Sequence, residues 1–470
     1  MSGNRIGAAH QANVSTGAGR LVLAVTILGS SLTFIDGSVV SIALPAIGAD
    51  LKADFGAIQW VVNGYLLMLA SLMLLGGSLG DRYGQRRVFI AGLCGFTVAS
   101  AACAFASSSA VLIAARAVQG AAAALLTPAS LALIGAHFSG EARGRAIGTW
   151  AAAAALTTAF GPVLGGWLVG SVGWRSIFLI NLPLAAIAGL LALRMPADAV
   201  AAPETPLDVA GSALAVATLG LASAGLIALG QGQRLQGAIA LVLALPAAGA
   251  FQWREHTAAA PMMPLALFRD RGFSGANLLT VLLYAALSGA LVLLPLFLID
   301  AHRYSATEAG AAMLPFSLVM GLLSRPAGAL GARLGPRIAL STGPALAAAG
   351  FALLAWLPHD GVSFAAGFLP GLLVLALGMT VAIPPLTTTV LDAVDDALEG
   401  TASGINNVAA RAGGLMAVAA LGLAMGGTPG GVQHSQGLEQ AYPIVMLVAA
   451  LLAAASAVIG AVMIPPRRTA

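Results

Sequence analysis

Two charged residues lie deep inside long apolar stretches of this sequence, and together they could let a carboxylate bind and release protons. Asp36 lies in FIDGSVVSIALPAIGADL, and Arg116 lies in LIAARAVQGAAAALLTP. At about 1.5 Å per helical residue, Asp36 is roughly 12 Å and Arg116 roughly 9 Å from the same end of their stretches. Similar depth predicts that the two charges pair, or lie close together, in at least one state. A carboxylate that alternates between burial and an arginine neighbour can take up and release protons. A purely structural ion pair is the alternative.

The elements that must position these residues are membrane-spanning helices. The chain has 470 residues, of which 59% are hydrophobic and 9% charged, and its mean hydropathy is +0.92. Apolar runs of about 18 residues or more indicate transmembrane helices, which satisfy their own backbone polar groups. The sequence therefore predicts an all-α membrane protein. Its fourteen expected spans are 21–44, 57–79, 88–106, 110–136, 146–170, 176–194, 208–230, 236–253, 273–299, 308–331, 337–357, 363–391, 401–426 and 441–464.

The basic residues between these spans predict the orientation of the chain. An even number of spans places both termini on one side of the membrane. That side would hold fifteen arginines, against four basic residues on the other, and cytoplasmic loops carry the excess of positive charge. We therefore expect both termini in the cytoplasm and the chain in the cell's inner (plasma) membrane. The first apolar run, about 24 residues, is too long for the core of a cleaved signal peptide.

Several classes of function are excluded by what the sequence lacks. Lys52 is the sole lysine, and its surroundings, ADLKADFG, are not the Gly-rich loop that a P-loop ATPase needs. No metal-ligand cluster or nucleophile–base pattern is present, and the net charge of +4 is spread over short loops. We therefore expect no enzyme activity, metal, cofactor or nucleic-acid partner. Transport of a solute against its concentration gradient would need an ion gradient or a partner chain as the energy source.

An internal repeat divides the chain into two halves. GGSLGDRYGQRR at 76–87 aligns with AGALGARLGPRI at 327–338, an offset of 251 residues, although Asp81 becomes Ala332. Parallel repeats are typical of transporters whose halves rock about a central site. The repeat predicts six-helix bundles at 21–195 and 256–464, a two-helix insertion at 196–255, and cytoplasmic tails at 1–20 and 465–470.

With these motifs the chain resembles the major facilitator superfamily, and most of all its fourteen-span drug:proton antiporters, over about residues 15–464. The superfamily's loop motif G-x-L-x-D-R-x-G-x-R-R is matched by Gly77, Asp81, Arg82, Gly84, Arg86 and Arg87. The resemblance implies that this turn is a hinge and latch that sets the inward/outward balance. Asp36 and Pro45 fit the first-helix motif, in which Ser38 and Ser41 replace the usual Thr and Asn. Arg116 and Gln119 fit the fourth-span motif.

The fifth span carries a motif that in the resembled family marks exporters. In GTWAAAAALTTAFGPVLGG the matching residues are Gly148, Gly161, Pro162, Gly165 and Gly166, with Thr157 in place of a further glycine. Thr157, Gly161 and Gly165 are four residues apart, so they share one helix face. Small residues at this spacing let two helices approach closely.

Other residues are weaker candidates. The possible substrate-cavity residues are Asn63, Tyr65, Gln119, Asn277, Tyr284, Met379 and Arg411. Asp300 is either a second protonatable group or an acid at a loop edge. We interpret Asn181, in GWRSIFLINLP, as structural, and expect Pro384 and Pro385 to kink or break the span 363–391.

The sequence thus favours a proton-coupled secondary transporter that exports amphipathic small molecules, such as drugs or antibiotics, by alternating access. We expect a monomer in the lipid bilayer, with a small-molecule substrate and protons as its partners. A narrow-specificity metabolite exporter, a proton-coupled uptake symporter of the same fold, and a non-transporting sensor or scaffold are the alternatives.

Overall fold

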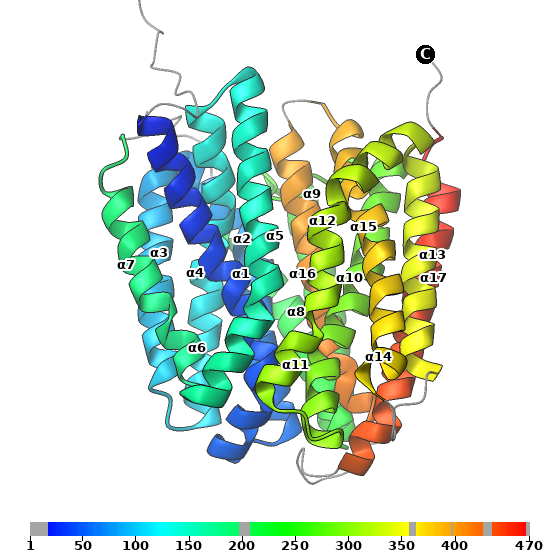
Figure 1. Ribbon diagram of the computed structural model, residues 1–470. Helices are drawn as coiled ribbons and strands as arrows, with labels where there is room; N and C mark the ends of the chain where they lie inside the picture. The colour runs from blue at the N-terminus through cyan, green and yellow to red at the C-terminus, as the bar shows by residue number, and fades with distance from the viewer. Residues whose placement is uncertain (1–16, 197–206, 357–362, 396–397, 426–434, 467–470) are drawn as a thin grey trace, which may run out of the picture.

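The fold is a pair of helical bundles standing side by side (Figure 1). The computed structural model describes residues 17–196, 207–356, 363–395, 398–425 and 435–466, and within these ranges the regular structure is entirely helical. Helix α1 begins and helix α17 ends at the same end of the molecule, which is the upper end in Figure 1. We use "upper end" and "lower end" in the sense of that view.

The first bundle contains the helices before residue 196. They are α1 (Gly17–Leu51), α2 (Phe55–Tyr83), α3 (Gln85–Ala104), α4 (Ser109–His137), α5 (Gly140–Ser171), α6 (Ser176–Leu179) and α7 (Asn181–Ala192). Its buried core is built from apolar faces of α1, α2, α3, α4 and α7. Helix α1 is longer than the expected span 21–44, because the chain stays helical through Pro45.

The second bundle contains the helices after residue 264. They are η1 (Leu265–Arg269), α10 (Arg271–Leu296), η2 (Phe297–Ala301), α11 (Ala306–Ala312), α12 (Leu314–Leu334), α13 (Pro336–Trp356), α14 (Phe364–Gly367), α15 (Leu369–Asp392), α16 (Glu399–Ala424) and α17 (Ser435–Met463). Helix α15 continues through Pro384 and Pro385. The break in this span lies instead at Phe368, where α14 ends, so the expectation of a break at the prolines is corrected.

The two-helix insertion packs against both bundles. It consists of α8 (Val209–Gly230) and α9 (Arg234–Thr257), which pack on each other. Helix α8 also contacts α2 of the first bundle and α16 of the second. An ion pair of 2.9 Å between Arg254 and Asp208 joins the last turn of α9 to the beginning of α8. The insertion therefore covers one side of the junction between the bundles.

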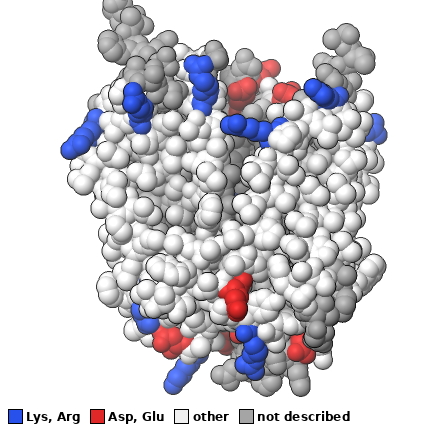
Figure 2. All heavy atoms as spheres, in the orientation of Figure 1, with Lys and Arg blue, Asp and Glu red and all other residues white. Residues whose placement is uncertain are grey.

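The helices have the lengths and composition of membrane spans. Among the described residues, thirteen helices are long and apolar enough to cross a membrane, and the shorter apolar segment Ser176–Ala192 occupies the place of the expected sixth span. Charged side chains gather towards the two ends, and the face between them is almost wholly uncharged (Figure 2). The expected all-α membrane fold is confirmed.

The two bundles are packed tightly at the lower end. A Cβ on Gly166 of α5 would lie 2.2 Å from the carbonyl oxygen of Ala306, and one on Gly310 of α11 would lie 2.3 Å from that of Pro162. In contrast, Gly148 near the upper end of α5 has no neighbouring atom within 4 Å of such a Cβ. A second cavity near the upper end lies between α2, α4 and α16. The lower end is thus closed by the contact of α5 with α11, whereas a cavity lies between helices near the upper end.

Candidate functional site

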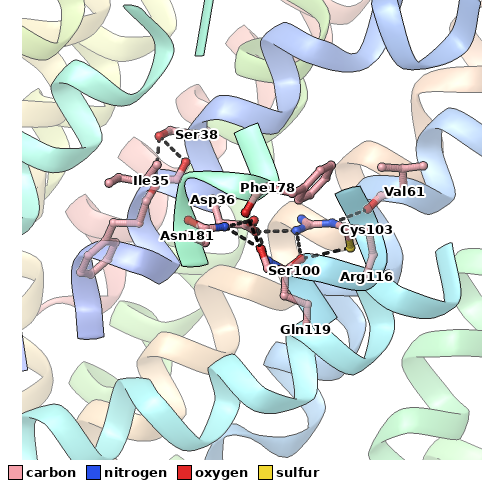
Figure 3. Close-up of polar contacts among 11 residues, drawn as sticks. Ile35, Asp36, Ser38, Val61, Ser100, Cys103, Arg116, Gln119, Phe178 and Asn181 are labelled. Carbon is pink, nitrogen blue, oxygen red and sulfur yellow. Dashed lines mark hydrogen bonds and ion pairs between the residues drawn. The ribbon is translucent and has the colours of Figure 1, made fainter. Parts of the chain in front are cut away.

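A buried ion pair joins the two charged residues that the sequence singles out. The guanidinium Nη1 of Arg116, on α4, contacts the carboxylate Oδ2 of Asp36, on α1. Asp36 is 0% and Arg116 1% exposed. The close-up in Figure 3 shows both side chains between the helices of the first bundle. The depth estimate therefore predicted this pairing correctly, although the residues are eighty positions apart.

Amide and hydroxyl groups complete a hydrogen-bonded network around the carboxylate (Figure 3). Gln119 donates to Asp36 Oδ1 at 2.9 Å and accepts from Arg116 Nη1 at 2.7 Å. Asn181 donates to the same Oδ1 at 3.5 Å and to Ser100 Oγ at 2.9 Å. Ser100 in turn donates to the carbonyl oxygen of Phe178 at 3.1 Å. The negative charge is thus held by neutral donors as well as by the arginine.

The remaining contacts of Arg116 connect the ion pair to helix α2. Its Nε donates to the carbonyl oxygen of Val61 at 3.1 Å. Its guanidinium carbon lies 4.3 Å from the ring centroid of Tyr65 and 5.8 Å from that of Phe178, within the range of cation–π attraction. Four helices, α1, α2, α4 and α6, therefore meet at one cation.

A central cavity between the bundles adjoins this network. Arg116 and Tyr65 line it from the first bundle, together with Ser38 and Ser41 of α1. Residues of α10, α12 and α16 line it from the second bundle, and Arg411 is the charged group among them. A cavity walled by both bundles is the arrangement that alternating access requires.

The other candidate cavity residues lie elsewhere. Gln119 belongs to the Asp36 network. The Asn63 amide faces α16, where in its satisfied orientation it donates to the Leu415 carbonyl at 3.3 Å and accepts from the Ala419 amide at 3.2 Å. Asn277 accepts from Asn406 at 3.3 Å, inside the second bundle. Neither asparagine lines the central cavity, nor do Tyr284 and Met379.

Asp300 lies away from the Asp36 network. It is part of the π-helical turn η2 at the lower end of the second bundle. It does not line the central cavity, and its Oδ2 has no hydrogen-bond partner among the described residues. Asp300 and Asp36 are therefore separate sites, and Asp300 has no arginine ion pair among the described residues.

Asn181 and Ser100 are the parts of the site that sequence reasoning missed. Asn181 begins α7 and is 0% exposed, and Ser100 on α3 is equally buried. A signal was available in the sequence. An amide side chain inside an apolar membrane segment is energetically costly, so its presence indicates a polar partner. The interpretation of Asn181 as structural did not predict that it lies beside the ion pair.

The fifth-span motif forms the contact surface of α5. Gly161 and Gly165 face α1, where an added Cβ would lie 1.9 Å from Ser38 Oγ and 2.9 Å from Val39 Cβ. Thr157 on the same face contacts the hydroxyl of Ser31 at 3.1 Å. Gly166 and Pro162 face α11 of the other bundle, as described above. The predicted close helix approach is confirmed, and it includes the lower-end contact between the bundles.

The charged turn between α2 and α3 holds the upper end of the first bundle together. Gly84 has φ of 96°, a left-handed conformation that favours glycine. Arg86 donates from Nε to the carbonyl oxygen of Ala192 at 3.0 Å and from Nη2 to that of Leu193 at 2.6 Å. Asp81 accepts from Gln85 at 2.8 Å. Arg86 thus caps the end of α7.

Comparison with known proteins agrees with this architecture. A family model described as Major Facilitator Superfamily matches residues 26–418 and 278–470. The chain is 34% identical over 454 residues to the tetracenomycin C resistance and export protein of Streptomyces glaucescens, covering 95% of this chain and 83% of that protein. It is also 34% identical over 440 residues to a methylenomycin A resistance protein of Streptomyces coelicolor, covering 91% of each.

Two further comparisons extend the picture. The multidrug resistance protein Stp of Mycobacterium tuberculosis is 34% identical over 408 residues, which are 86% of this chain and 75% of that protein. The crystal structure of a D-xylose–proton symporter superimposes with a TM-score of 0.69 at 13% identity, covering 96% of this chain and 99% of that one. This structural likeness concerns the fold alone.

The helical bundles, the cavity between them and the buried ion pair define a multi-pass membrane transporter rather than an enzyme. The chain belongs to the major facilitator superfamily.

Proposed function

We propose that this protein is a proton-coupled exporter of amphipathic small molecules that works by alternating access. The observation that carries the proposal is the buried Asp36–Arg116 pair beside a cavity that both bundles line. A carboxylate at 0% exposure is stable as an anion only while it is paired. Protonation of Asp36 would release Arg116, and so would couple proton binding to a rearrangement of α1, α2 and α4.

The names of the relatives support export and leave two ranges of substrate open. The Streptomyces relatives are named for resistance to single compounds, whereas Stp is named for multidrug resistance. A narrow-specificity exporter is therefore the second candidate. Uptake symport is disfavoured because these relatives are named for resistance or export.

The arrangement in the membrane follows from charge and symmetry. We propose bundles at 21–195 and 256–464 with the insertion at 196–255, and both termini in the cytoplasm, because the arginine-rich loops then lie inside. The upper end, with the cavity between α2, α4 and α16, is then cytoplasmic. A single chain supplies both walls of the cavity, so the transporting unit is a monomer, and a proton gradient stands in place of a cofactor.

The test is dye movement in liposomes that contain the purified protein, under an imposed pH gradient. Wild type should drive an amphipathic dye against its gradient, and Asp36→Asn should not. Asp50→Asn is the matched control: Asp50 lies on the same helix and pairs with Arg175 at 2.6 Å, but its side chain is 46% exposed. Gradient-driven movement that persists in Asp36→Asn would refute the assignment of Asp36.

A further inference from the structure

The central cavity has positive charge on its wall and no acid. Its lining residues include Arg116 and Arg411, and none of them is Asp or Glu. The nearest deep carboxylate, Asp36, is fully buried behind Arg116 and does not line the cavity. A cationic substrate in this state would therefore meet the positive charge of Arg411 and no exposed counter-charge.

The two arginines differ in what neutralises them. Arg116 is paired with Asp36. Arg411, in the middle of α16, makes no ion pair or hydrogen bond with any described residue, and its side chain is partly exposed. A lone guanidinium at membrane depth is costly unless an anion or water approaches it. Arg411 thus presents an unsatisfied positive charge to the cavity.

Tyr65 supplies a hydrogen-bonding group beside this charge. It lines the cavity, is 2% exposed, and its buried hydroxyl has no partner among the described residues. Tyr65 and Arg411 line the same cavity. Unpaired buried hydroxyls are uncommon, because leaving one without a hydrogen bond is energetically costly. An acceptor atom of a bound molecule would satisfy it.

The rest of the wall is mainly apolar, although it also carries the hydroxyl side chains of Thr33, Ser38, Ser41, Thr158, Ser288 and Ser317. Phe34 and Leu66 of the first bundle face Leu291, Val292 and Phe316 of the second. This surface suits a flat hydrophobic body, whereas the arginine suits a planar anionic group that can accept two parallel N–H bonds.

We propose that the cavity selects amphipathic compounds that carry an anionic group, a carboxylate or an acidic phenolate, with Arg411 as the counter-ion and Tyr65 as a second donor. The proposal rests on the transport function proposed above for its biological use, but its binding chemistry can be tested without transport. Arg411 then acts as a specificity residue, distinct from the proton-binding pair.

The experiment compares two dyes with the same ring system and opposite charge, the anion fluorescein and the cation rhodamine 123. Their binding to the purified, detergent-solubilised protein is measured by fluorescence polarisation at neutral pH. The variants are Arg411→Gln, Arg411→Lys and Tyr65→Phe, with Arg325→Gln as the control. Arg325 is an exposed arginine of α12 that does not line the cavity. Thermal unfolding of each variant shows that it is folded.

Wild type should bind fluorescein more tightly than rhodamine 123. Arg411→Gln should weaken fluorescein binding by about tenfold or more, as expected for loss of a charged hydrogen-bond donor. Arg411→Lys should retain part of the affinity, Tyr65→Phe should lose less than Arg411→Gln, and Arg325→Gln should match wild type. Tighter wild-type binding of rhodamine 123, no binding of fluorescein, or unchanged fluorescein binding in Arg411→Gln would overturn the proposal. Selective anion binding without pH-driven transport would instead count against proton coupling and leave anion selection standing.

Discussion

Asp36 on α1 and Arg116 on α4 form an ion pair that is almost fully shielded from solvent. The pair lies within the first bundle, at the wall of a cavity that the second bundle completes. Moving both charges out of water is expensive, and the cost is offset only by good geometry and by further hydrogen bonds. Gln119 and Asn181 supply such bonds to the carboxylate.

Removing one member of this pair should destabilise the protein more than removing both. Arg116→Met leaves the Asp36 carboxylate buried without its partner, which should cost about 3–5 kcal/mol of unfolding free energy. The double variant Asp36→Asn, Arg116→Met should regain much of the lost unfolding free energy. Denaturant unfolding in detergent measures both. Additive losses in the double variant would contradict a direct pairing.

The sequence predicted this pair because depth along a helix can be counted from the ends of an apolar run. Rotation about the helix axis could not be counted in the same way. Asn63 and Asn277 were therefore expected at the cavity, but they face α16 and the interior of the second bundle. Helices in a bundle are buried on several sides at once, so an apolar pattern does not mark the face that lines a cavity.

Gly166→Ala should open the lower end of the molecule. The added methyl group would lie 2.2 Å from the carbonyl oxygen of Ala306, so α5 and α11 must separate. We expect faster labelling of a cysteine at the cavity-lining position 41 (Ser41→Cys) by an impermeant maleimide from that side. Gly148→Ala is the control, because its methyl group meets no atom within 4 Å. Equal labelling in the two variants would argue against the lower contact as the seal.

Substitutions of two neighbouring arginines in the α2–α3 turn should affect the stability of the protein differently. Arg86→Gln loses two hydrogen bonds to the last carbonyl groups of α7, and should lose about 1–3 kcal/mol of stability. Arg87 is exposed, so Arg87→Gln should leave stability within about 0.5 kcal/mol. Thermal unfolding of the two variants decides this, and equal losses would show that the turn acts through its charge alone.

Asn181→Ala should weaken the network that holds Asp36. The variant loses the bond to Ser100 at 2.9 Å and the longer one to Asp36, and should lose about 1–3 kcal/mol. Asn407→Ala is a suitable control, because that exposed amide only donates to the carbonyl of Ser403 in its own helix, at 3.0 Å. If the two variants unfold at the same temperature, Asn181 does not support the carboxylate.

The sequence allowed predictions about bundles and helices, but not about which helices contact one another. The repeat at 76–87 and 327–338 located two bundles, and the apolar runs located their helices. The packing of α8 against α2 and α16 could not be predicted, because its only polar residues are Ser and Thr, which do not identify the helices it contacts. The break at Phe368 could have been predicted, because Gly367 and Pro370 flank it and Pro370 lies in the first turn of α15.

The most direct test of the account is to measure proton movement and substrate exchange in the same liposomes. A pH-sensitive dye trapped inside reports protons, and labelled substrate reports exchange at equal pH on both sides. In wild type, substrate should move protons in the opposite direction. In Asp36→Asn, exchange should persist while substrate-induced proton movement disappears, with Asp50→Asn behaving as wild type. Substrate-induced proton movement that survives in Asp36→Asn would contradict the central claim that Asp36 carries the coupled proton.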